Sequence, residues 1–185
     1  MRRSIKVNGE TFVVMLSERR IKERVKALAR KINRDYRGKV PVFIGVLNGS
    51  FIFFADLIRE ISVECEVDFL KLSSYGDLKI SSGNVTLLKD LNCQVTGRDI
   101  LIVEDIVDSG LSMEYIKSLI LRQNPSSFKI VTLLYKKEAV KSDIHLDYVG
   151  FAIPRDFVIG YGLDYAQRVR NLRAIYRLKE TKAGS

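Results

Sequence analysis

Histidine and cysteine, the residues of many metal and nucleophile sites, are almost missing from this sequence. Its 185 residues include one histidine, His145, and two cysteines, Cys65 and Cys93. No Ser-His or Cys-His hydrolase site can be assembled without His145, which lies in a polar segment. The cysteines have neither the spacing of a zinc site nor that of a disulfide framework. We therefore expect reduced, partly buried thiols and a cytoplasmic compartment.

Long apolar runs and the common nucleotide-binding motifs are absent as well. No apolar run approaches the roughly 18 residues that a membrane-spanning helix needs, and the basic residues 1–6 lack the apolar core of a secretion signal. Neither G-x-G-x-x-G nor G-x-x-x-x-G-K-[ST] occurs. These absences argue against a membrane protein, an NAD enzyme and a P-loop nucleotide hydrolase.

Positive charge is abundant but confined to one part of the chain. The net charge is +9, and residues 1–39 hold 13 Lys and Arg against 4 Asp and Glu. The other 146 residues hold 18 of each sign. The ordinary interpretation is the solvated face of a helix. Attraction of anionic substrates or of nucleic acid is the alternative, and we do not expect nucleic acid as the partner.

Strand patterns alternate with helix patterns along most of the chain. This alternation predicts an α/β fold whose central sheet is mostly parallel and flanked by helices, and the length fits one domain. Residues 63–73 alternate so that Glu66 and Asp68 form a wetter face than Val67 and Phe69. We predict strands over 5–7, 10–14, 41–47, 63–73, 85–91, 100–103, 128–135 and 148–153, and helices over about 17–38, 51–60 and 113–124.

Residues 100–112 are the most informative stretch. Four β-favouring apolar residues, 100–103, are followed by Glu104, Asp105 and Asp108 and then by a turn rich in serine and glycine that begins a helix. Backbone N–H groups of such a turn hold anions. Acids beside an anion site require a ligand that also carries hydroxyl groups or a cation. A ribose 5′-phosphate supplies the hydroxyls, and Mg²⁺ with pyrophosphate supplies the cation.

Residues 103–112 resemble the phosphoribosyl diphosphate (PRPP) loop of type I phosphoribosyltransferases. Further motifs resemble the purine-salvage branch of that family, the hypoxanthine-guanine phosphoribosyltransferases, and they occur in the family's order and spacing. These motifs lie at residues 45–50, 53–57, 74–75, 133–137, 149–151 and 157–165.

The resemblance implies a role for each residue of the PRPP loop. Glu104 and Asp105 would hold the ribose hydroxyls, directly or through Mg²⁺, and Asp108 would exchange a proton with purine N7 as general acid/base. The backbone of residues 108–112 would hold the 5′-phosphate. The residues implied in this phosphate site are Asp108, Ser109, Gly110, Leu111 and Ser112.

The resemblance also implies a purine site. Lys136 would donate to the 6-oxo group, which favours hypoxanthine or guanine over adenine. Phe157 would stack on the base and the Val158 backbone would read its edge. Asp164 is implied beside the base and also as a ligand of Mg²⁺ through water, so the implied metal set is Glu104, Asp105 and Asp164.

A pyrophosphate site and a lid complete the implied machinery. Leu47, Asn48, Gly49 and Arg170 would bind pyrophosphate, and in the family the peptide bond before residue 48 can be cis. The segment beginning at Ser74 and Tyr75 would close over the site and exclude water. Two positions depart from the family pattern. Asn48 replaces a lysine that many members carry, and Leu111 occupies a position that is often lysine.

The resemblance thus implies Mg²⁺-dependent transfer of 5-phosphoribosyl from PRPP to N9 of hypoxanthine or guanine, giving IMP or GMP and pyrophosphate. It further implies one phosphoribosyltransferase domain over residues 1–185. Its core would span about 36–153, and a small hood would be built from about 1–16 and 154–178. A homodimer or homotetramer is implied as the assembly.

Two alternatives stay open. A regulator with this fold could bind RNA through its basic N-terminal helix without catalysis, although the presence of Asp108, Lys136 and Asp164 argues against that function. An enzyme for another base, such as xanthine or a pyrimidine, is the second alternative. The sequence does not rank hypoxanthine, guanine and xanthine.

Overall fold

The larger sheet of the protein is mostly parallel. The computed structural model describes residues 3–74, 85–140 and 143–179. Among these residues, six strands pair in the order β5-β4-β3-β6-β7-β8, and only β5 runs antiparallel to its neighbour. This confirms the predicted α/β class. The strands are β3 (Val42–Leu47), β4 (Glu66–Ser74), β5 (Val85–Lys89), β6 (Asp99–Val107), β7 (Ser127–Tyr135) and β8 (Tyr148–Ala152).

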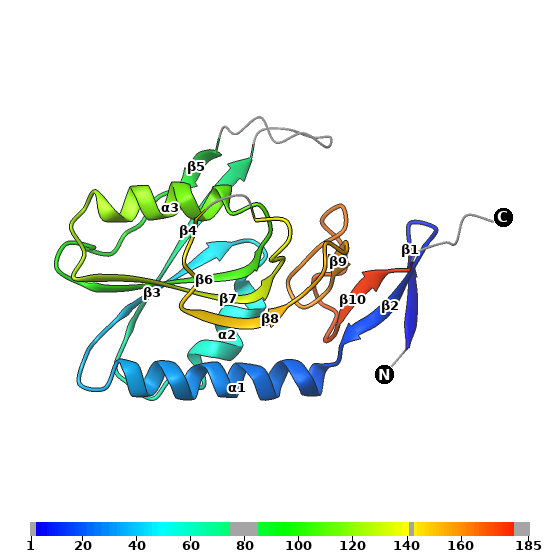
Figure 1. Cartoon of the computed structure of the whole chain (residues 1–185), viewed down its shortest axis with the longest axis horizontal. Helices are drawn as coiled ribbons and strands as arrows, with labels where there is room; N and C mark the ends of the chain where they lie inside the picture. The colour runs from blue at the N-terminus through cyan, green and yellow to red at the C-terminus, as the bar shows by residue number, and fades with distance from the viewer. Residues whose placement is uncertain (1–2, 75–84, 141–142, 180–185) are drawn as a thin grey trace.

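Helices cover both faces of this sheet (Figure 1). Helices α1 (Glu18–Asp35) and α2 (Phe51–Ile58) lie on one face, and α3 (Leu111–Leu121) lies on the other. Successive side chains of a strand point to opposite faces. In β6, Leu101 and Val103 accordingly pack in the cluster that contains the α1 and α2 side chains, whereas Ile102 packs with α3. The central strand is therefore buried on both sides.

Helix α1 carries the excess positive charge on its solvent face. Its apolar stripe, Ile21, Val25, Leu28 and Ile32, is buried, and the Ser17 side chain accepts a hydrogen bond from the Arg20 N–H as the N-cap. The helix predicted over about 17–38 is thus confirmed, with a capping serine and a buried apolar stripe. No helix among the described residues is long and apolar enough to cross a membrane.

The two ends of the chain form a second, antiparallel sheet, which we call the hood. It contains β1 (Ser4–Val7), β2 (Glu10–Leu16), β9 (Val158–Ile159) and β10 (Ile175–Leu178) in the order β1-β2-β10-β9. The Asn8-Gly9 turn joins the predicted N-terminal hairpin. Strands β9 and β10 were not predicted as strands, because two and four residues show no clear period. The division into one domain with these boundaries stays a prediction.

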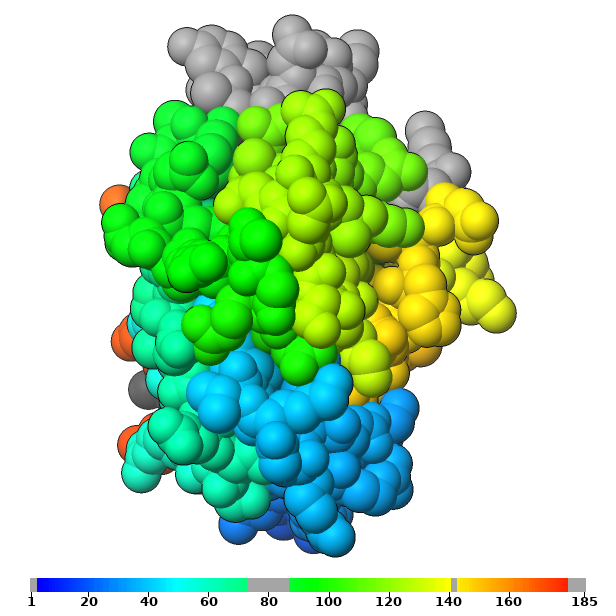
Figure 2. Space-filling view, turned by 90° about the vertical axis from the view of Figure 1, so that its left-hand side faces the viewer, coloured from blue at the N-terminus to red at the C-terminus, as the bar shows by residue number. Residues whose placement is uncertain are grey.

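The hood stands opposite the carboxyl ends of the central strands (Figure 1). Figure 2 views the other end of the core, where green and light-blue segments that lead into the strands dominate and the hood is almost hidden. In open α/β sheets, ligands bind beyond the carboxyl ends of the strands. This arrangement places any such ligand between the core and the hood.

Strand β4 corrects one sequence prediction. Asp68, predicted on the wetter face, is only 7% exposed, whereas Val67 is 52% exposed. Asp68 accepts hydrogen bonds from the backbone N–H groups of Asn92 (2.6 Å) and Cys93 (2.9 Å), and it therefore ties the segment after β5 to the sheet. Burial alone would raise its pKa, but the hydrogen bonds from backbone N–H groups lower the pKa to about 2.

Replacing Asp68 by asparagine should destabilise the fold. A carboxyl group whose pKa is lowered in the folded state stabilises it above the unfolded pKa, and that stabilisation is lost as pH falls toward 2. We expect Asp68→Asn to lower the free energy of unfolding at pH 7 by about 2 kcal/mol, measured by urea denaturation. The exposed Asp90, whose side chain accepts a hydrogen bond from the N–H of the next residue, Leu91, supplies the control Asp90→Asn. Equal effects of the two variants would contradict this role.

Candidate active site

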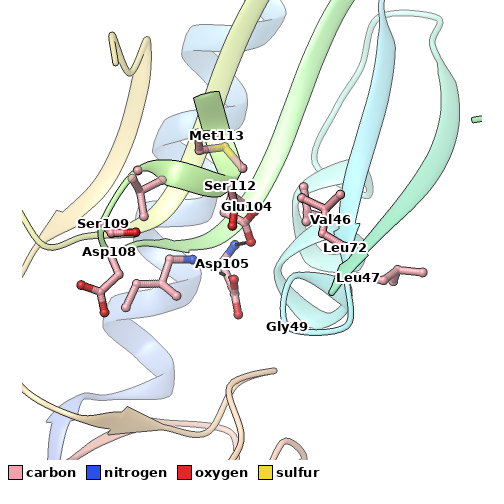
Figure 3. A pocket seen from close by; sticks show the side chains of 13 residues that line it. Val46, Leu47, Gly49, Leu72, Glu104, Asp105, Asp108, Ser109, Ser112 and Met113 are labelled. Carbon is pink, nitrogen blue, oxygen red and sulfur yellow. Dashed lines mark hydrogen bonds between the residues drawn. The ribbon is translucent and has the colours of Figure 1, made fainter. Parts of the chain in front are cut away.

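Strand β6 itself carries the two adjacent acids of the site. Glu104 and Asp105 were expected just beyond a strand that ends at residue 103, but β6 continues to Val107 because its pairing with β7 continues. Glu104 is 8% and Asp105 is 6% exposed. The two carboxylates are therefore held by the sheet at the edge of a pocket (Figure 3), not by a loop.

Burial makes this carboxylate pair electrostatically unfavourable. It raises the pKa of Glu104 well above its ordinary value, and the neighbouring Asp105 charge raises it further. Burial also raises the pKa of Asp105, although a hydrogen bond from Glu104, the N–H of Ile106 and the Arg170 charge act in the opposite direction. Among the described residues neither carboxylate forms an ion pair. Hydroxyl donors or a cation from a ligand would relieve this repulsion.

The segment after β6 forms an anion site at the start of α3. Gly110 is the N-cap with φ +87°, and as a glycine it has no side chain to cap the first N–H groups of the helix. Uncapped N–H groups and the helix dipole attract an anion. Leu111 and Ser112 are exposed. The Leu111 N–H donates to Ser109 Oγ at 3.5 Å, whereas no side-chain acceptor among the described residues bonds the N–H groups of Ser112 and Met113. The turn predicted to hold a phosphate thus has free donors.

The loop after β3 lies against the same acids. The Leu47–Asn48 peptide bond is cis, as the resemblance implied. A Cβ atom on Gly49 would stand 1.8 Å from Oδ2 of Asp105, so a side chain is excluded at this position. Gly49 therefore approaches Asp105 through its backbone.

These segments line one pocket of about 250 Å³ (Figure 3). It includes most of the predicted sugar, phosphate and pyrophosphate residues. It also includes the apolar residues Val46, Leu72 and Met113, to which the sequence analysis gave no role in the site. They lie in predicted strands and a predicted helix, and a periodic pattern does not show which side chains of an element line a pocket. The predicted residues on the wall are Leu47, Gly49, Glu104, Asp105, Asp108, Ser109, Gly110 and Ser112.

Lys136 forms an ion pair with Asp108, which the sequence analysis did not predict. Lys136 Nζ lies 2.7 Å from Asp108 Oδ2, and the Lys136 backbone N–H donates to the Val107 carbonyl. The lysine is 8% exposed, whereas the Asp108 side chain is 55% exposed. A buried cation is thus presented beside an accessible carboxylate.

The hood supplies the remaining predicted residues. Phe157 is 45% exposed and packs at the edge of Tyr165, with ring centres 5.5 Å apart. The neighbouring Val158 is buried in β9. Asp164 forms an ion pair of 2.8 Å with Arg170.

The predicted metal residues are not a single protein cluster. Among the described residues no group of three or more carboxylate, histidine or cysteine side chains is placed to bind a metal alone. The buried pair Glu104 and Asp105 still fits Mg²⁺, which is commonly bound through one or two carboxylates together with substrate oxygens. Of the predicted lid, Ser74 ends β4 and Tyr75 lies outside the described residues.

Removing one charge from the buried pair should stabilise the ligand-free protein. A carboxyl group whose pKa is raised by folding lowers the stability of the folded protein as pH rises above the unfolded pKa. We expect Glu104→Gln to raise the Tm at pH 8 by about 3 °C or more and the gain to shrink toward pH 5. Thermal unfolding followed by circular dichroism across this pH range measures it.

The exposed Glu66 provides the control with the opposite sign. A hydrogen bond from Arg98 lowers the pKa of Glu66, so Glu66→Gln should not raise the Tm at pH 8. A Glu104→Gln variant no more stable than wild type at pH 8 would contradict the assigned repulsion.

Comparison with known proteins agrees with this geometry. Residues 15–166 match the model of the phosphoribosyl transferase domain. A hypoxanthine-guanine phosphoribosyltransferase of Bacillus subtilis is 49% identical over 166 residues, which cover 90% of this chain and 92% of that protein. One from Dictyostelium discoideum is 43% identical over 171 residues, with 90% and 95% covered.

Solved structures resemble the whole architecture. A crystal structure of a hypoxanthine-guanine phosphoribosyltransferase from Bacillus anthracis, with HEPES in its active site, has a TM-score of 0.85 and 44% identity, and the match covers 89% of this chain and 96% of that chain. A hypoxanthine phosphoribosyltransferase from Staphylococcus aureus has a TM-score of 0.86 and 42% identity, with 90% of each chain covered. The chain therefore belongs to the phosphoribosyltransferase family, in its hypoxanthine-guanine phosphoribosyltransferase branch.

Proposed function

We propose that this enzyme transfers the 5-phosphoribosyl group of PRPP to N9 of hypoxanthine or guanine in a Mg²⁺-dependent reaction, giving IMP or GMP and pyrophosphate. The observation that carries the choice of base is the pair Lys136 and Asp108, whose charged atoms are 2.7 Å apart. On a 6-oxopurine, O6 and N7 are neighbours on one edge. A lysine donor beside a carboxylate acceptor matches O6 together with a protonated N7.

The proton of the base leaves through Asp108. As N9 forms its bond to C1′, the purine loses the proton from N7, and the Asp108 carboxylate accepts it. The electron pair of the C1′–O bond departs with pyrophosphate, so the transition state resembles an oxocarbenium ion. The 55% exposure of the Asp108 side chain supports its access to a base entering from the hood side.

The buried acids and the α3 turn hold the phosphoribosyl group. Glu104 and Asp105 accept hydrogen bonds from the ribose hydroxyls, and the free N–H groups at the start of α3 bind the 5′-phosphate. Mg²⁺ bound at these carboxylates and, through water, at Asp164 would neutralise charge that develops on the leaving pyrophosphate. Because fixed groups orient PRPP, less entropy has to be lost on the way to the transition state.

The base and the leaving group are held from the hood and the β3 loop. Phe157 stacks on the purine and the Val158 backbone reads its edge. Arg170 and the backbone of residues 47–49 bind pyrophosphate. The loop beginning at Ser74 and Tyr75 closes over the site and excludes water that would hydrolyse PRPP.

We also propose a homodimer or homotetramer in the cytoplasm. Large apolar side chains stay exposed on α2, β4 and β5, namely Phe51 (43%), Val67 (52%) and Leu88 (58%), and they support an interface between copies. Cys65 and Cys93 are free, and burial raises the pKa of both thiols, to about 11 for Cys93. Such unreactive thiols suit a reducing compartment.

A nucleobase panel with PRPP and Mg²⁺ tests this function. We expect nucleotide formation with hypoxanthine or guanine and little with adenine or uracil; no turnover with either 6-oxopurine would contradict the proposal.

Lys136→Ala should lower kcat/KM for hypoxanthine about 30-fold or more, because a buried charge pair loses one partner. It should also reduce the ratio of kcat/KM for hypoxanthine to that for adenine. The adjacent exposed Lys137 gives the control Lys137→Ala, expected to behave as wild type.

Asp108→Asn separates proton transfer from PRPP binding. An asparagine cannot accept the N7 proton, so we expect kcat at neutral pH to fall about 10²-fold or more while PRPP binding is retained. Steady-state kinetics and calorimetric titration with PRPP and Mg²⁺ measure the two quantities, with Asp90→Asn as the control. Equal loss of turnover and of PRPP binding would refute this division of roles.

A further inference from the structure

A hydrogen bond joins the hood to α2 outside the substrate pocket. The Tyr161 hydroxyl donates to Asp56 Oδ2 at 2.7 Å. Tyr161 belongs to the hood segment between β9 and β10, whereas Asp56 lies on α2, which directly follows the residue 47–49 loop. Tyr161 is only 5% exposed, and burial, together with the neighbouring Asp56 carboxylate, raises its pKa, so the phenol stays protonated and donates.

The same two segments meet at a second point. A Cβ atom on Gly162 would stand 2.1 Å from the carbonyl oxygen of Gly49, so the two backbones are in direct contact. Tyr161 reaches this arrangement in the left-handed region, with φ +53°, between two glycines that also have positive φ. Few non-glycine residues adopt this conformation. A tyrosine therefore stands at a position where the backbone conformation alone would favour glycine.

Gly162 is also hydrogen-bonded to a charged residue of the hood, Arg170. Its N–H donates to the Arg170 carbonyl at 2.9 Å, and its own carbonyl accepts from Arg170 Nη1 at 2.9 Å. Arg170 Nη2 in turn lies 2.8 Å from Asp164 Oδ1. A shift of Gly162 relative to Gly49 would thus move Arg170 and Asp164 relative to the β3 loop.

We propose that Tyr161 and Asp56 are positioning residues that set the width of the pyrophosphate site between hood and core. Their hydrogen bond fixes the Gly162 backbone against Gly49 and keeps Arg170 at the correct distance from the residue 47–49 loop. This inference rests on the proposed function, because it concerns the leaving-group side of the same reaction. Neither side chain touches a substrate in this role.

The proposal predicts a selective loss of affinity. PRPP needs both sides of the pyrophosphate site, whereas IMP leaves that site empty. Removing the Tyr161 hydroxyl should therefore weaken PRPP much more than IMP. A purely structural role would instead lower thermal stability and weaken both ligands alike.

Tyr161→Phe tests this selectivity by calorimetric titration with PRPP and Mg²⁺ and, separately, with IMP. We expect the Kd of PRPP to rise about tenfold, corresponding to one ordinary hydrogen bond, and the Kd of IMP to stay within about twofold. Tyr148→Phe is the matched control, because the Tyr148 hydroxyl is equally buried and donates to Asp35 on α1 at 3.0 Å. That control should change the Tm but not the affinity for PRPP.

Variants of Asp56 complete a double-mutant cycle. Asp56→Ala should raise the Kd of PRPP as much as Tyr161→Phe does, and the double variant should bind PRPP no more weakly than either single variant. Asp56→Asn should bind PRPP nearly as the wild type does, because its amide oxygen can still accept the hydrogen bond from Tyr161. Additive losses of PRPP affinity in the double variant, or an equal loss of affinity for IMP, would overturn the inference. A wild type that forms no IMP from PRPP and hypoxanthine would refute the proposed function, whereas active enzyme with unchanged PRPP affinity in Tyr161→Phe refutes only the positioning role.

Discussion

The buried pair of carboxylates at the end of β6 is the constraint on which the site depends. Glu104 and Asp105 repel each other in a desolvated position, and among the described residues no cation is paired with either of them. Apolar residues of similar volume in place of these two acids would stabilise the fold better. The surrounding parts instead fit around the charges: Gly49 has no side chain to collide with Asp105, and the uncapped start of α3 faces the same pocket. The sheet thus carries a repulsion that hydroxyl donors or a cation from a ligand would relieve.

The hood complements this arrangement from the other side. Its strands come from both ends of the chain, and antiparallel pairing between β2 and β10 joins them. The segment between β9 and β10 then returns toward α2 and the β3 loop, where Gly162 meets Gly49. A leaving group that carries several negative charges is best stabilised by groups fixed before the reaction begins. A cationic side chain of the hood, such as Arg170, is long and does not by itself determine its distance from the core. Backbone contacts of this kind are therefore needed to fix its position.

Local sequence patterns predicted the strands and helices of the core and the functional stretch at residues 100–112. They did not predict contacts between segments that are distant in the sequence. Apolar spacing identified α1 and every strand of the larger sheet, and the acids followed by a small-residue turn indicated the sugar–phosphate site. Asp68 was assigned to the wrong face because its partners, the N–H groups of Asn92 and Cys93, lie 24 and 25 residues away. The Lys136–Asp108 ion pair spans 28 residues and Tyr161–Asp56 spans 105. No periodic pattern reports such pairs, so the short hood strands and the positioning contact required the structure.

The pairing of Lys136 with Asp108 connects substrate choice to catalysis. In the ligand-free protein Lys136 is the ion-pair partner of Asp108, the residue that we propose to accept the N7 proton. In the proposed reaction, a 6-oxopurine that inserts its O6 and N7 edge would give each charged group a new partner: O6 would accept from Lys136, and N7 would donate to Asp108. Adenine presents a donor in place of O6 and would offer Lys136 no acceptor at that position. On the proposed function, the same pair of residues would therefore both select the base and supply the group that accepts its proton.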